Sequence, residues 1–137
     1  MPLKYSDALR NAQINAIETT AGATPILKIW AGTLPANCAA ADVASNLMLC
    51  QIAVPTDFLT TAAIGSATIN GGPWTGTGHA NAGAGTAATH WRLYTSAGTV
   101  PAVMQGDVTT DLVLNNVNIA TGQTVSVTQF TIAAGNG

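Results

Sequence analysis

Charged side chains are scarce in this sequence. Four Lys and Arg and six Asp and Glu make up only 7% of its 137 residues, and the net charge is -2. Nucleic-acid binding needs clustered Lys and Arg to displace counterions, so we expect no nucleic-acid partner. Disorder goes with low hydrophobicity and high net charge, whereas 47% of these residues are apolar. The composition therefore predicts a folded, weakly charged domain.

Cysteine and long apolar runs are also scarce. Cys38 and Cys50 are too few for a disulfide framework, and their spacing fits no zinc motif. We expect two buried or half-buried thiols, with a Cys38–Cys50 bridge only in an oxidising compartment. No apolar run approaches the roughly 20 residues of a membrane span, and the first residues lack the plan of a secretory signal. We therefore expect no membrane partner.

Groups with catalytic potential are few and scattered. His90 lies on a predicted strand whose polar face also carries Arg92, which is typical of a solvated or hydrogen-bonded surface histidine, and His79 lies in a glycine-rich stretch. Only Asp107 and Asp111 are close in sequence, and stabilisation of a turn explains them better than acid–base catalysis. An enzyme would need a pocket that unites one of these histidines with one of these carboxylates.

Motifs for a nucleophile or a cofactor are missing as well. Residues 65–68 lack the second glycine of a nucleophile elbow. The glycine-rich stretch 76–85 has no Lys and no predicted helix after it, so it is neither a phosphate loop nor a dinucleotide fingerprint. We expect no catalytic residue, no metal site and no cofactor, and hence a protein that is not an enzyme.

One helix is predicted, at the start of the chain. Ser6 is a suitable N-cap, no Gly or Pro interrupts until Gly22, and Pro25 prevents the helix from resuming. The apolar stripe expected to pack consists of Leu9, Ala12, Ala16 and Ile17, widened by Ile14, and the solvated face consists of Arg10, Asn11, Asn15 and Glu18.

After Pro25 the apolar period changes from about 3.6 to about 2, which is typical of strands. Strands are predicted at residues 26–31, 46–54, 62–70, 86–95, 100–108, 111–119 and 124–133, with a long loop at 32–45 and an irregular excursion at 74–85. Apolar positions change face near Gln129, which predicts a bulge or a change of sheet there.

These elements predict one domain over residues 1–137, all-β, with an arm and helix at 1–22. Residues 25–137 are expected to form an antiparallel β-sandwich or jelly-roll-like barrel of about seven or eight strands.

Several segments together resemble small tailed-bacteriophage virion proteins. They are residues 9–12 (LRNA), 27–35 (LKIWAGTLP), 91–100 (WRLYTSAGTV), 111–114 (DLVL) and 119–125 (IATGQTV). The resemblance spans most of the chain and carries no catalytic residues. It implies a capsid decoration or cement protein, made in the bacterial host cytoplasm and bound to the major capsid protein on the virion surface. A homo-oligomer, trimer or dimer, is expected. The alternative is a tail, neck or fibre-associated module that binds a receptor or glycan.

Two segments are candidates for the contacts with such a partner. The N-terminal helix either caps its own sandwich or reaches a neighbouring subunit through Leu3, Tyr5, Leu9 and Ile14. Trp74 lies between glycines in a predicted loop, where it either anchors the loop on the core or is presented as an interface anchor.

Overall fold

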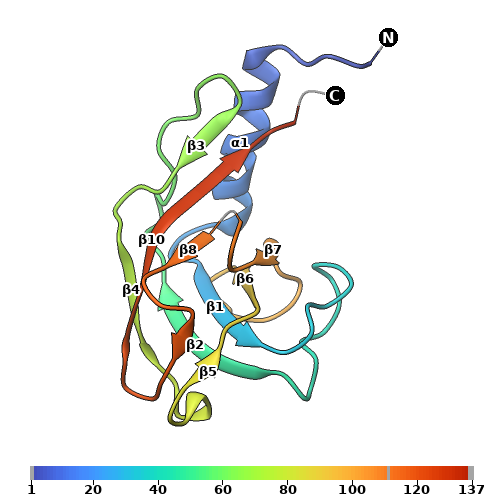
Figure 1. The fold of residues 1–137 in the computed structure, drawn as a ribbon. Helices are drawn as coiled ribbons and strands as arrows, with labels where there is room; N and C mark the ends of the chain where they lie inside the picture. Colours follow the sequence, from blue (N-terminus) through green and yellow to red (C-terminus); the bar gives the residue numbers. More distant parts are fainter. Residues whose placement is uncertain (1, 111, 136–137) are drawn as a thin grey trace.

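The computed structural model describes residues 2–110 and 112–135, so Asp111 lies outside the described residues. Helix α1 (Asp7–Ala21) packs beside the β domain at the end where both chain termini lie (Figure 1). The Ser6 hydroxyl accepts a hydrogen bond from Leu9 N at 3.2 Å, and Gly22, with a φ of 74°, ends the helix. The helix predicted from capping signals is thereby confirmed.

The β structure accounts for most of the remaining elements. In the described residues it comprises β1 (Ile26–Ala31), β2 (Leu47–Ala53), β3 (Ser66–Thr68), β4 (Trp74–Gly78), β5 (Thr86–Ala87), β6 (His90–Tyr94), β7 (Met104–Asp107), β8 (Leu112–Leu114), β9 (Asn118–Ile119) and β10 (Thr124–Ala133), with a short 3-10 helix η1 (Ala80–Ala82) after β4. These are ten strands rather than about seven or eight, because the predicted strands at 86–95 and 111–119 each contain two and β4 lies outside all the predicted strands.

The main sheet is antiparallel and curls into a half-barrel. Its strand order is β3-β10-β4-β2-β1-β6-β7, and β8 also pairs with β10, while β5 and β9 form a separate small sheet. The predicted all-β fold with a short N-terminal helix is confirmed. The predicted irregularity near Gln129 is also confirmed, because the register with β8 shifts between Val127 and Gln129. Beyond this point β10 changes its partner from β4 to β3 (Figure 1).

The irregular excursion expected at residues 74–85 is wrong at residues 74–78, where β4 lies as an internal strand between β2 and β10; residues 79–85 form η1 and turns. Glycine makes this placement feasible. A Cβ atom at Gly78 would overlap the carbonyl oxygen of Ala120, and one at Gly76 would lie 2.8 Å from the carbonyl oxygen of Gln51. The glycines that favoured a loop on local grounds instead permit a close approach between backbones.

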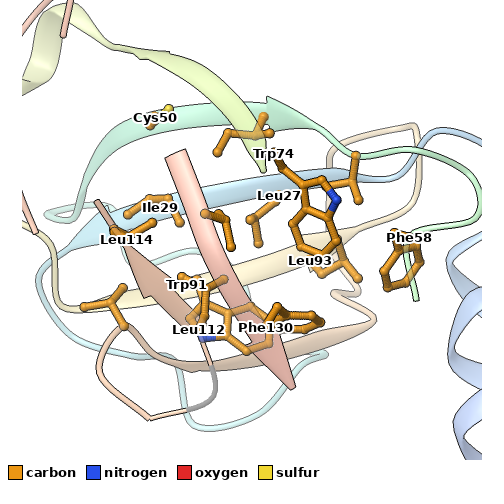
Figure 2. Packing of buried hydrophobic residues seen from close by; sticks show 14 of the residues in the cluster. Leu27, Ile29, Cys50, Phe58, Trp74, Trp91, Leu93, Leu112, Leu114 and Phe130 are labelled. Carbon is orange, nitrogen blue, oxygen red and sulfur yellow. The ribbon is translucent and has the colours of Figure 1, made fainter. Parts of the chain in front are cut away.

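Aromatic side chains form the centre of the core (Figure 2). The ring centroids of Trp74 and Trp91 each lie 5.4 Å from that of Phe130. The Phe58 ring packs edge-on against Trp74, with centroids 6.0 Å apart. Helix α1 adds Ile14, which is only 2% exposed. The helix therefore closes the core of its own domain.

Candidate functional site

Helix α1 turns three polar side chains toward the β domain. Arg10 Nε donates to the Ala134 carbonyl at 3.1 Å, Asn11 Oδ1 accepts from Gly65 N at 2.8 Å, and Glu18 Oε1 accepts from Leu59 N at 2.7 Å. The solvated face predicted for the helix is therefore wrong at these three residues. Backbone groups in connections and at strand ends that lack partners in the sheet need hydrogen-bond partners, and these side chains supply them.

Because α1 turns polar side chains toward the β domain, an apolar stripe of the helix lies in solvent. Leu9 is 46% exposed, and Ala12 and Ala16 are exposed as well. Because these residues follow one another at a spacing of three and four, they share one face of the helix. We call Leu9, Ala12 and Ala16 the helix surface.

A second exposed apolar residue lies in the turn that contacts α1. Ile64 is 72% exposed and has a φ of 52°, a left-handed conformation that is strained for a β-branched residue. The next residue, Gly65, receives the Asn11 hydrogen bond. The tip of this turn therefore lies at the helix end of the molecule.

The structure divides the five predicted interface residues. Ile14 and Trp74 are 2% and 4% exposed and belong to the hydrophobic core, so they present almost no surface for a contact. Trp74 is held further by a hydrogen bond from its Nε1 to the Asn70 carbonyl at 3.0 Å. Leu3 is exposed and Tyr5 is half-buried. Leu3, Tyr5 and Leu9 stay predictions.

A polar cluster that the sequence analysis missed lies on the outer face of β6. Arg92 is fully buried, although its strand face was predicted to be solvated. Its Nη1 pairs with Asp42 Oδ1, to which the Tyr94 hydroxyl also donates at 2.6 Å. Its Nη2 donates to the carbonyls of three residues in the β1–β2 connection, Asn37, Cys38 and Ala40. The available signal was the long connection at 32–45, which must cover some part of the sheet.

The two histidines lie apart and have structural partners. His90 is buried, stacks on Trp30 with ring centroids 6.4 Å apart and is 2.9 Å from the Thr89 hydroxyl. Burial, followed by the nearby Arg92 charge, lowers the pKa of His90 from its ordinary value of 6.5. His79 Nδ1 accepts from Asn81 N at the start of η1.

An enzyme would need a pocket shared by a histidine and a carboxylate. His90 lies opposite Asp107 in the β6–β7 pairing. Neither residue lines any of the three cavities described in the covered part of the chain. Within residues 2–110 and 112–135, no group of three or more His, Cys, Asp or Glu residues could hold a metal ion.

One cavity, of about 350 Å³, lies between β7 and the end of β10. It is lined mainly by apolar side chains and is bordered by the loop over β6; the lining residues are Cys38, Trp91, Val103, Met104, Gln105, Phe130, Thr131, Ile132 and Ala133. Both cysteines are free thiols, Cys38 half-buried and Cys50 buried, as predicted. Burial raises the pKa of Cys50 to about 11.

In the described part of the chain, no helix is long and apolar enough to cross a membrane. Comparison of the chain with protein-family models, with curated proteins and with solved structures gives no match.

Proposed function

We propose that this protein is a non-enzymatic structural protein of a tailed-bacteriophage virion that binds the capsid lattice and reinforces it. The class of protein rests on the resemblance of residues 9–12, 27–35, 91–100, 111–114 and 119–125 to small virion proteins. The observation that carries the binding role is the helix surface. The helix surface is apolar and exposed, while the same helix uses Arg10, Asn11 and Glu18 to bind its own domain.

An exposed apolar stripe is better covered than solvated, because burial of apolar surface stabilises an assembly by about 25 cal/mol per Å². Leu3, 67% exposed, and Ile64, 72% exposed, would extend the contact beyond the helix surface. The low charge of the chain also suits it to close packing against other subunits. The partner proposed is the major capsid protein.

Reinforcement follows from mass action. A protein that binds only the assembled lattice lowers the free energy of the assembled state relative to the free subunits. Particles that carry the protein should resist heat and osmotic shock better than particles that lack it. Unchanged resistance would contradict a cementing role.

The test is binding of purified protein to particles that lack it, measured by co-sedimentation. A Leu9→Glu and Ala16→Glu double variant places two charges on the helix surface and should weaken binding by about tenfold or more. The matched control is Thr77→Glu on the exposed face of β4, which should bind as the unmodified protein does. Circular dichroism of each variant verifies its fold. Equal binding by all three proteins would exclude the helix surface as the contact.

Copy number separates a head protein from the alternative location in the tail, neck or fibre. Quantitative mass spectrometry of purified particles should find hundreds of copies if the protein covers the lattice. A handful of copies would contradict the capsid proposal and favour the tail. Because Trp74 is buried in the core, the structure offers no support for a glycan platform built on this residue.

A further inference from the structure

The connection between β1 and β2 covers the outer face of β6 without forming a helix or strand. We call residues 33–46 the strap. No residue of the strap belongs to the hydrophobic core of the described chain, although Pro35 is buried. The strap is held mainly by polar contacts, so its attachment can change while the core stays packed.

Arg92 is the centre of that attachment. Its Nη2 reaches the carbonyls of Cys38 at 3.1 Å and Ala40 at 3.0 Å, and its Nη1 pairs with the Asp42 carboxylate. Among the described residues, Asp42 is the only carboxylate in contact with this guanidinium. A buried cation is stable only with a paired counter-charge, so the attachment depends on the charge of Asp42.

The other charged and titratable groups around the cluster offer no second anion in contact with Arg92. Lys28 Nζ lies 5.0 Å from the centre of the Tyr94 ring and donates to the Gly98 carbonyl. His90 lies beside Arg92 and faces Asp107, which is exposed. Without the Asp42 charge, two cations, Lys28 and Arg92, would remain beside the Tyr94 ring.

Cys38 connects the strap to the cavity between β7 and β10. Cys38 lines that cavity, and its carbonyl accepts from both Arg92 Nη2 and Ala102 N, the latter at 2.8 Å. Movement of the strap at Cys38 would therefore change the lining of this cavity.

We propose that the strap is a charge-held latch: the Asp42 carboxylate, paired with Arg92, keeps it closed, and removing that charge frees it from β6 and opens the Cys38 side of the cavity. The half-barrel and α1 stay folded during this change, because no strap residue packs in the core. The latch does not depend on the virion role proposed above.

The two cysteines make the test specific. In an Asp42→Asn variant at neutral pH, a thiol reagent should label Cys38 about tenfold faster or more than in the unmodified protein, because the buried Arg92 keeps its charge but loses its counter-charge. Cys50 lies in the core and should stay unlabelled, which shows that the domain has not unfolded. The matched control is Asp107→Asn, an exposed carboxylate on the neighbouring strand, which should leave Cys38 labelling unchanged.

Two results would overturn the latch. If Cys38 and Cys50 become reactive together in Asp42→Asn, the carboxylate stabilises the whole domain rather than the strap. If neither rate changes, the charge of Asp42 does not hold the strap.

Discussion

Arg10 and Ala134 connect the two ends of the chain. The Arg10 guanidinium on α1 donates through Nε to the Ala134 carbonyl at 3.1 Å, directly after β10 ends. The same guanidinium also pairs through Nη1 with Asp7 at 3.3 Å on its own helix. A charged side chain therefore fixes the position of the helix against the last strand.

Replacing Arg10 tests this connection. Arg10→Met keeps most of the aliphatic stem but leaves the Ala134 carbonyl without its charged donor, so the free energy of unfolding should fall by about 1–3 kcal/mol. The control is Gln13→Met on the exposed side of α1, with an expected change within about 0.5 kcal/mol. Urea denaturation measures both. Equal effects would show that the Arg10 hydrogen bond does not stabilise the docked helix.

Replacing Trp74 tests whether its side chain packs in the core or lies in an exposed loop. Because its ring contacts Phe58 and Phe130, Trp74→Ala should lower the free energy of unfolding by about 3–5 kcal/mol. Thermal melting followed by circular dichroism would detect this loss directly. An unchanged melting temperature in Trp74→Ala would contradict the placement of this side chain in the core.

Gly78 is expected to tolerate no side chain. Gly78→Ala places a Cβ atom on the Ala120 carbonyl oxygen, so β4 or the Ala120 turn must move and the protein should lose several kcal/mol of stability or fail to fold. Gly135→Ala is the control, since no atom lies within 4 Å of its Cβ position. The soluble yield and the melting temperature of the two variants should differ sharply. Similar values would contradict the close approach.

His90 should make stability depend on pH. Its pKa is lowered in the folded protein, chiefly by burial, so the unfolded chain binds more protons just below pH 6.5. Stability is therefore complete above that value and falls as the pH decreases toward the folded pKa. Urea midpoints at about pH 7 and about pH 5.5 should differ for the unmodified protein and for a His79→Gln control. His90→Gln should reduce the difference, and an unchanged difference would assign the dependence to another group.

Local signals in the sequence determined the elements whose causes are local. Ser6 and Gly22 bound α1, the apolar alternation predicts β1 at residues 26–31, and the face change near Gln129 coincides with the bulge in β10. Each depends on a few neighbouring residues and on backbone geometry that tertiary contacts do not reverse. The all-β class followed from the same periodicity.

Only the tertiary structure decided which faces are buried. Arg10, Asn11 and Glu18 lie inward because Ala134, Gly65 and Leu59, far along the chain, offer backbone groups that need partners. Such partners leave no trace in the helical periodicity, so the helix surface could not be predicted from it. Arg92 likewise became buried because the strap folds back over β6 and brings Asp42 across 50 residues of sequence. A buried charge is stable only beside a counter-charge, and Arg92 and Asp42 come together only when the chain folds.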